Sequence, residues 1–149
     1  MKKLRGVEME IEDCAYKLVD KTVITDQLDV ACKDIDWAVL IGGFSVKGSW
    51  KNFERDSLLS GNVPIFSQMG KAINEHAKKS VKVVVVANPA NTNALTLMQN
   101  APSIPKKNFS ALTRLDHNRA ISELARRLKV PNEKVQNVAI WGNHSRTQF

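Results

Sequence analysis

Two short stretches in the last quarter of the chain hold residue types that could bind a carboxylate and move a proton. Residues 112–120, LTRLDHNRA, place Asp116 and Arg119 one helical turn apart, and residues i and i+3 share a helix face. Residues 141–145, WGNHS, place the lone His144 in a turn-like context. An acid, a guanidinium and an imidazole are the groups that such chemistry requires. Asp116, Arg119 and His144 are therefore the first candidate site residues.

Each of these patterns also has an ordinary structural interpretation. An aspartate and an arginine at this spacing usually form a surface ion pair worth roughly a few tenths of a kcal/mol. A single histidine near a strand end is more often structural than catalytic, and the Asn88-Pro89 dipeptide is typical of a turn. His76 and His117 are expected to be solvated or structural.

The length and composition of the chain limit the classes of protein to which it can belong. A chain of 149 residues fits one domain, and a mean hydropathy of −0.27 indicates a soluble, globular protein with no membrane span or signal peptide. The net charge of +7 comes from short, scattered basic pairs without interleaved aromatic residues, which favours a solvated surface over nucleic-acid binding. Cys14 and Cys32 match no metal-binding spacing, so we expect reduced structural thiols and no metal site.

Alternating patterns of helix and strand predict βαβ units and a parallel sheet. We expect strands at 22–25, 34–43, 81–87 and 135–141, and helices at 6–18, 26–33, 53–74, 91–98 and 113–128, with a helical turn at 131–133 and loops at 44–52 and 100–107. Asp26 is the expected N-cap of its helix, and Gly61-Asn62 and Pro64 are expected to divide the 53–74 helix. Ligands bind beyond the carboxyl ends of parallel strands, so the loops after Gly43, Ala87 and Trp141 are the places expected to carry function.

Five blocks of the sequence resemble the cytosolic type of NAD-dependent malate dehydrogenase, in the lactate/malate dehydrogenase superfamily. The blocks are GVEMEIEDC at 6–14, VANPANTN at 86–93, APSIP at 101–105, LTRLDHNRA at 112–120 and WGNHSRTQ at 141–148. They are long, lie in a consistent order and together extend over essentially the whole chain.

The resemblance implies a role for each member of the first candidate site. His144 would be the acid/base residue that accepts the hydroxyl proton of malate and returns it in the reverse direction. Asp116 would hold the other ring nitrogen and fix the tautomer of that histidine. Arg119 would bind the substrate carboxylate through two parallel hydrogen bonds.

The resemblance also implies residues that contact substrate and cofactor. Asn88 would touch both, after a cis peptide bond to Pro89, with Val86 and Ala87 lining the nicotinamide side. Arg55 would be a second substrate-binding arginine, from the family's mobile loop. Asn62 would contact the cofactor.

Several features depart from the family pattern. We find no GxGxxG-like segment, so we expect a central fragment: a partial Rossmann-like α/β parallel sheet lacking its first βαβ unit. The expected division is residues 1–111 for the remainder of the dinucleotide-binding domain and 112–149 for the beginning of the α/β substrate domain. We expect the isolated 149 residues to be unstable or to aggregate, because missing strands leave bare sheet edges.

The mobile loop is also altered. Ser45 and Val46 stand where the family has a proline and its first arginine, and Val46 cannot pair with a second substrate carboxylate. Lys47 or Lys51 would supply only a point charge. Met69 replaces an expected glutamine, with Gln68 one residue earlier.

The leading interpretation is an NAD-dependent malate dehydrogenase of malate metabolism and the tricarboxylic acid cycle, with malate and oxaloacetate as substrates. The resemblance implies a cytoplasmic homodimer with no nucleic-acid or membrane partner, and leaves NAD against NADP open. The alternatives are a dehydrogenase of relaxed 2-oxo acid specificity, a non-catalytic truncated paralogue that acts by binding or dimerising, and, more weakly, a basic nucleic-acid-binding fragment.

Overall fold

The valine-rich segment 81–85 contains the central strand of a three-stranded parallel sheet, and its alternate side chains Val81, Val83 and Val85 are fully buried. The computed structural model describes residues 2–44, 55–142 and 148–149, with only the backbone described at residues 2 and 55–59. The strands are β1 (Trp37–Leu40), β2 (Lys82–Val85) and β3 (Phe109–Ala111), in the order β1-β2-β3. The helices are α1 (Lys2–Asp13), α2 (Leu28–Cys32), α3 (Arg55–His76), α4 (Ala90–Gln99) and α5 (Arg114–Leu128), with short 3-10 turns η2 (Lys106–Asn108) and η3 (Asn132–Lys134).

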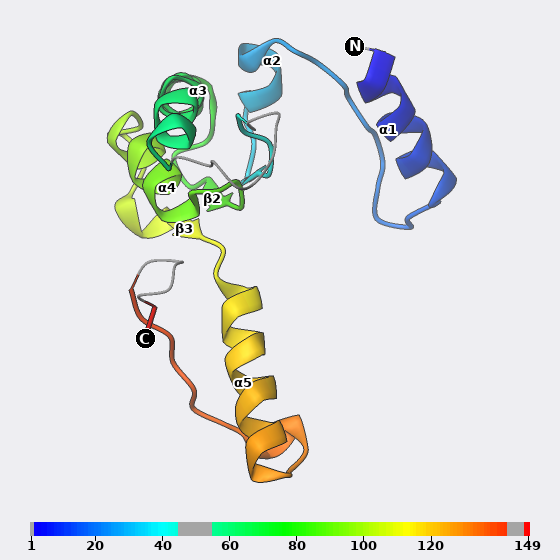
Figure 1. Ribbon diagram of the computed structural model, residues 1–149. Helices are drawn as coiled ribbons and strands as arrows, with labels where there is room; N and C mark the ends of the chain where they lie inside the picture. Colours follow the sequence, from blue (N-terminus) through cyan, green and yellow to red (C-terminus); the bar gives the residue numbers. More distant parts are fainter. Residues whose placement is uncertain (1, 45–54, 143–147) are drawn as a thin grey trace.

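Both strand pairs are parallel, with Val39 opposite Val84 and Val84 opposite Ser110. The connections run β1–α3–β2 and β2–α4–β3, so each crossover passes through a helix (Figure 1). The α/β class and the Rossmann-like parallel sheet expected from the sequence are confirmed. All three carboxyl ends consequently lie at one edge of the sheet.

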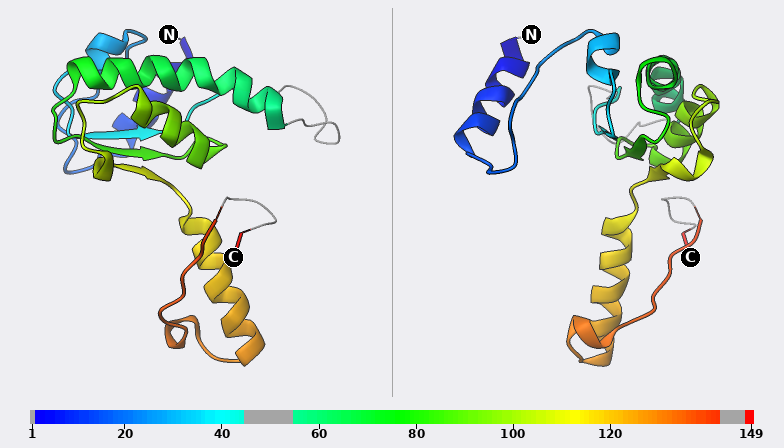
Figure 2. Two further views of the ribbon diagram at one scale, coloured as in Figure 1. Left: turned by 90° about the vertical axis from the view of Figure 1, so that its left-hand side faces the viewer. Right: turned by 180° about the vertical axis from the view of Figure 1, so that it is seen from behind.

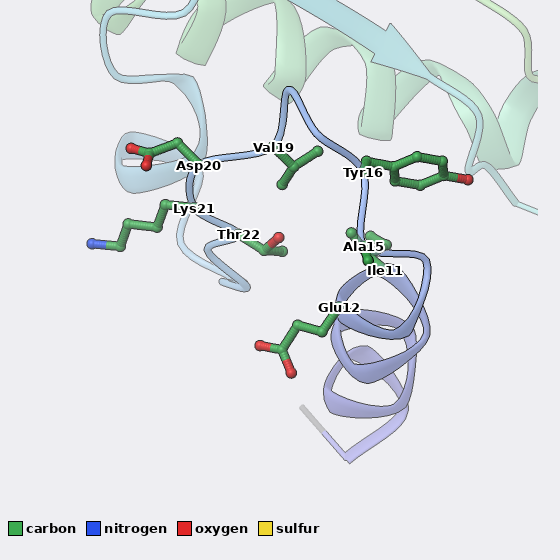
Figure 3. Close-up of a pocket in the computed structure, with 8 residues that line it drawn as sticks. All are labelled: Ile11, Glu12, Ala15, Tyr16, Val19, Asp20, Lys21 and Thr22. Atoms are coloured by element: carbon green, nitrogen blue, oxygen red, sulfur yellow. The ribbon is translucent and has the colours of Figure 1, made fainter.

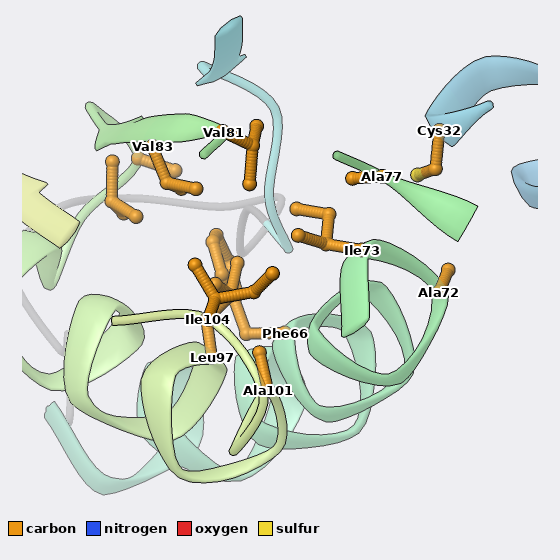
Figure 4. Packing of buried hydrophobic residues seen from close by; sticks show 12 residues of the cluster. Cys32, Phe66, Ala72, Ile73, Ala77, Val81, Val83, Leu97, Ala101 and Ile104 are labelled. Carbon is orange, nitrogen blue, oxygen red and sulfur yellow. The ribbon is translucent and has the colours of Figure 1, made fainter. Parts of the chain in front are cut away.

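The core lies between one face of the sheet and the helices α3 and α4 (Figure 4). Phe66 and Ile73 of α3 and Leu97 of α4 are fully buried against Val83 and Val85 of the central strand. Burial of apolar side chains of this size stabilises the fold by about 1.5–3 kcal/mol each. This packing fixes the two helices on the sheet and thereby fixes the strand ends that follow.

Helix α3 is one continuous helix, and the expected break at Gly61-Asn62 and Pro64 is wrong. Proline in a helix interior removes one backbone hydrogen bond and disfavours the preceding turn. Here Pro64 is exposed, while Phe66 two residues on is buried in the core. Core packing of the following turns outweighs the local preference for a break, because propensity is a weak determinant beside burial.

Two of the expected strands are absent from the described residues, and one strand was not expected. Residues 22–25 and 135–141 join no ladder, although their β-branched side chains predict strands. A strand is stable only beside a partner that takes its backbone hydrogen bonds, and these two segments lie away from the sheet. The short β3 pairs with β2 and was missed because three residues carry almost no periodic signal.

Helix boundaries at the amino-terminal side differ from expectation. Helix α1 ends at Asp13 rather than residue 18, and Ala15 then takes a left-handed conformation with φ of 47°. Asp26 does not cap α2: the N-cap position is Gln27, whose side chain makes no capping bond. Gln27 instead donates its backbone N–H to the Thr25 hydroxyl at 3.0 Å.

Helices α1 and α5 are both separated from the three-stranded sheet (Figure 1 and the right-hand view of Figure 2). Helix α5 begins at the expected place, with Thr113 at its N-cap position, and is joined to β3 through Leu112. No helix in the described part of the chain combines the length and the apolar character needed to cross a bilayer.

Candidate active site

The ends of β1 and β2 are joined directly, and this junction positions the predicted cofactor-contacting residues. The Leu40 carbonyl accepts hydrogen bonds from the N–H groups of Val86 at 2.8 Å and Ala87 at 3.1 Å. Gly43 then passes so close to the second strand end that a Cβ on it would lie 3.3 Å from the Ala87 Cβ. The loops after the two strands therefore leave the sheet side by side, as their positions in the sequence predicted.

Asn62 lies beneath this junction and is fully buried. Its Oδ1 accepts a hydrogen bond from the Phe44 N–H at 2.9 Å, and its Nδ2 donates to the Phe44 carbonyl at 3.5 Å. A Cβ on Gly43 would meet the same Oδ1 at 2.7 Å, so this position needs glycine. In the structure the side chain of Asn62 holds the chain leaving β1, while its predicted contact with a cofactor stays a prediction.

Asn88 is the exposed polar residue at the end of β2. The peptide bond to Pro89 is cis, as expected. Val86 is half-buried and Ala87 is buried, so the strand end presents one amide side chain beside mostly apolar neighbours. An amide both donates and accepts hydrogen bonds, which suits contact with a polar ligand at this edge.

Asp116 and Arg119 lie together at the start of α5, with 3.8 Å between Oδ1 and Nη1. Their environments differ sharply, because the aspartate side chain is 12% exposed and the arginine side chain is 68% exposed. The carboxylate is therefore held in the protein while the guanidinium faces solvent. The Leu112 N–H donates to the Val85 carbonyl at 2.9 Å, which sets the start of α5 close to the end of β2.

The remaining predicted residues are outside what the structure describes. His144 lies in the undescribed segment 143–147, and Ser45, Val46, Lys47 and Lys51 lie in the undescribed segment 45–54. The backbone of Arg55 begins α3, but its side chain is not described. The structure thus brings Asp116 next to Arg119, and Val86, Ala87 and Asn88 next to the chain held by Asn62.

Two residues that the sequence did not single out as site residues make contacts that connect elements of the candidate site. His117, expected to be solvated or structural, contacts the Val138 carbonyl through Nε2 at 3.0 Å and the Arg114 guanidinium through Nδ1 at 3.3 Å. It therefore ties α5 to the segment that leads toward residue 144. Asn93 is a buried asparagine in the first turn of α4. The sequence signal that could have indicated it is a polar residue one turn before Leu97, on the same helix face.

A metal-ligand cluster or a pocket among the described residues could mark a further site. No cluster of three or more potential metal ligands is found among them. A pocket of about 340 Å³ lies between the end of α1 and the chain that follows it (Figure 3). Its lining residues include Glu12, Tyr16 and Lys21 and none of the predicted site residues, so it is separate from the candidate site.

Family models match almost the whole chain. The NAD-binding domain of lactate/malate dehydrogenase matches residues 1–110, and the alpha/beta C-terminal domain of the same family matches residues 113–149. The chain belongs to the lactate/malate dehydrogenase family.

Named relatives and solved structures agree with this assignment. The chain is 55% identical to the cytoplasmic malate dehydrogenase of Rattus norvegicus and 54% identical to that of Homo sapiens, over 98% of this chain and 43% of each relative. It superposes with a TM-score of 0.91 on the malate dehydrogenase of Naegleria fowleri, at 42% identity over 100% of this chain and 45% of the other. The lactate dehydrogenase of Trichomonas vaginalis in complex with NADH and oxamate also gives 0.91, at 38% identity over 99% and 44%. The chain therefore spans less than half the length of these proteins.

Proposed function

We propose that this chain carries the central part of the active site of an NAD-dependent malate dehydrogenase. The observation that supports the proposal best is the Asp116–Arg119 pair at the start of α5, with a largely buried carboxylate beside an exposed guanidinium. It occurs in a chain 55% identical to a cytoplasmic malate dehydrogenase over 98% of its length. We further propose that residues 1–111 belong to the dinucleotide-binding domain and residues 112–149 to the substrate domain.

In the proposed reaction, Arg119 binds the carboxylate beside the reacting carbon through its two parallel N–H groups. Arg55 provides a second cation for the substrate. His144 accepts the hydroxyl proton of malate during oxidation and returns it to the carbonyl oxygen of oxaloacetate during reduction. Asp116 accepts a hydrogen bond from the other ring nitrogen and stabilises the imidazolium. Asn88 orients the substrate at the strand end.

The residues at the end of β2 fit a nicotinamide. Asn88 offers an exposed amide, and the neighbouring Val86 and Ala87 offer apolar surface. A Cβ on Gly42 would meet no described residue within 4 Å, so the described backbone there leaves room for close approach. NAD, when bound, supplies the hydride acceptor and donor of the reaction. Asn62 is also proposed to contact the cofactor. A comparison of NADH with NADPH as the reductant tests which of the two cofactors the protein uses.

The proposed setting is the cytoplasm, as in the names of the relatives, and the proposed assembly is a homodimer without nucleic-acid or membrane partners. Exposed apolar side chains on α1 support association through this helix: Leu4, Val7 and Met9. The same exposed residues favour a second candidate, a non-catalytic paralogue that acts only by dimerising. Enzymatic turnover separates the two functions.

The decisive experiment measures oxidation of NADH by oxaloacetate with the purified protein, and then with His144→Asn. Turnover by the wild-type protein would support the dehydrogenase proposal, and the variant is expected to lose more than about a hundredfold of that kcat, because general acid–base catalysis contributes factors of that order. His76→Asn is the matched control, since His76 lies at the end of α3 beside Glu75. Undiminished turnover by His144→Asn would refute the assigned role, and its absence in the wild type would favour the dimerising paralogue.

Substrate range is tested in the same assay by comparing oxaloacetate with pyruvate. Val46 is expected to weaken the preference for oxaloacetate, because it cannot pair with the second carboxylate. A strong preference for oxaloacetate would contradict relaxed specificity.

A further inference from the structure

A buried side chain outside the proposed chemistry holds the strand end that carries Asn88. Asn93 is 1% exposed, and its Nδ2 donates a hydrogen bond to the Ala87 carbonyl at 3.0 Å. Its backbone N–H donates to the Pro89 carbonyl at 2.9 Å. The first turn of α4 therefore binds the chain on both sides of Asn88.

The hydrogen bond from Asn93 completes the fixation of Ala87. The Ala87 N–H donates to the Leu40 carbonyl at 3.1 Å, and the Ala87 carbonyl accepts from Asn93. One peptide group is thus held by β1 and the next by α4. The direction in which the chain leaves Ala87 is then determined, and so is the place of the exposed Asn88.

The position of Asn93 on its helix is otherwise suited to an apolar residue. Leu97, one turn later on the same face of α4, is fully buried in the core. A buried amide is retained at such a place only where its hydrogen bonds are satisfied, since an unpaired one destabilises the fold. The structural context therefore connects this asparagine to the strand end.

We propose that Asn93 is a positioning residue for the dehydrogenase reaction. Its amide fixes the Ala87 carbonyl so that Asn88 presents its side chain at the carboxyl edge of the sheet, and Asn93 itself touches neither substrate nor cofactor. The inference rests on the proposed function, because it acts through the role of Asn88 there.

The test replaces Asn93 by leucine, which has the same branching and the same number of side-chain heavy atoms but no hydrogen-bond donor. Asn100→Ala is the matched control, because Asn100 lies at the other end of the same helix and its Nδ2 donates to the Thr96 carbonyl at 2.9 Å. Amide hydrogen exchange of residues 86–88 and 90 is measured in the ligand-free protein. It is expected to accelerate about tenfold in Asn93→Leu and to stay unchanged in Asn100→Ala, since about tenfold corresponds to one lost hydrogen bond.

A double-mutant cycle with Asn88→Ala separates positioning from general stability. Asn93→Leu is expected to lower kcat/KM for oxaloacetate about tenfold in the wild-type background and less than twofold in the Asn88→Ala background. An equal loss in both backgrounds would overturn the proposal, as would unchanged exchange at residues 86–88 and 90. Lack of turnover by the wild type would instead refute the proposed function, and the exchange measurement would still decide whether Asn93 holds this turn.

Discussion

At the scale of single residues, Asp116 and Arg119 differ in solvent exposure, although their spacing in the sequence predicts a simple surface ion pair. Both lie on one face of α5, yet the carboxylate is largely buried and the guanidinium is largely exposed. Their 3.8 Å separation is longer than a close charge-assisted hydrogen bond. The guanidinium fork is thus presented to solvent, where an anionic ligand can bind it.

The first prediction concerns that fork. Arg119→Lys is expected to lower kcat/KM for oxaloacetate about ten- to hundredfold, because an ammonium keeps the charge but loses the two parallel hydrogen bonds. Arg127→Lys is the control: Arg127 lies on the same helix and its Nε bonds to Glu123 at 2.8 Å. That hydrogen bond is the main cause that lowers the pKa of Glu123. Equal losses in both variants would contradict a binding role for Arg119.

A second prediction concerns the two thiols. Cys14 is exposed, whereas Cys32 is buried with its sulfur 4.0 Å from that of Met69, and burial raises the pKa of the Cys32 thiol. A disulfide reagent at neutral pH is expected to modify Cys14 quickly and Cys32 slowly, because the thiolate is the reactive form. Mass spectrometry of the wild type and Cys14→Ser distinguishes them. Rapid labelling of Cys32 in the folded protein would contradict this assignment.

The raised pKa of the Cys32 thiol determines how the stability of the fold changes with pH. The folded state binds the Cys32 proton more tightly than the unfolded state does. The contribution of the Cys32 thiol to the stability of the fold is therefore fully present below the ordinary pKa of a thiol. It is lost as the pH rises through the raised pKa of Cys32 in the folded state. Cys32→Ala is expected to reduce the loss of stability in the alkaline range, which denaturant titrations at several pH values can measure.

At the scale of elements, the close contact of α3 with α4 determines where both strand ends lie. Gly70 allows it, because a Cβ there would lie 2.6 Å from the Leu97 carbonyl oxygen and 2.8 Å from the Asn100 Cβ. A backbone oxygen on a packed helix cannot move away easily. The two crossover helices therefore approach at a point where only glycine fits.

The third prediction compares two helical glycines. Gly70→Ala is expected to lower the free energy of unfolding by about 1–3 kcal/mol, because overpacking must separate α3 from α4. Gly6→Ala is the control: a Cβ on Gly6 meets no described residue within 4 Å, and alanine favours the helix. Urea unfolding followed by circular dichroism measures both. A Gly70→Ala variant as stable as Gly6→Ala would contradict the close contact.

At the scale of the whole molecule, one face of the sheet is covered by α3 and α4 and the other face shows apolar side chains to solvent. On β1 and the residue after it, alternate side chains are more than half exposed: Trp37, Val39 and Ile41. Strand β1 is also an edge strand of the sheet. Uncovered apolar faces and free edges promote association.

The fourth prediction follows from this face. Val39→Lys is expected to reduce binding of a hydrophobic dye and light scattering by the purified chain, because it places a charge within the uncovered apolar surface. Leu18→Lys is the control, since Leu18 is 99% exposed on the segment after α1 and belongs to no such face. If both variants change association equally, general charge rather than this face controls it.

The sequence alone indicated the family and the α/β class, both of which are confirmed, and it predicted the residues of the candidate site. Locally encoded features were correct as well: α5 with its Asp116 and Arg119 spacing, the central valine strand and the cis bond before Pro89. Each depends on periodicity or on the chemistry of neighbouring residues. The residues that determine each of these features lie within one short stretch of the chain.

The tertiary structure decided what depends on distant partners. Residues 22–25 and 135–141 carry strand-like side chains but do not join the sheet in the described chain, while β3 forms because β2 lies beside it. Pro64 stays within α3 because Phe66 and Ile73 pack in the core. The opposite exposures of Asp116 and Arg119 and the hydrogen bond from Asn93 to Ala87 likewise follow from packing across the fold. Burial and hydrogen-bond partners arise between elements, so local sequence patterns do not contain them.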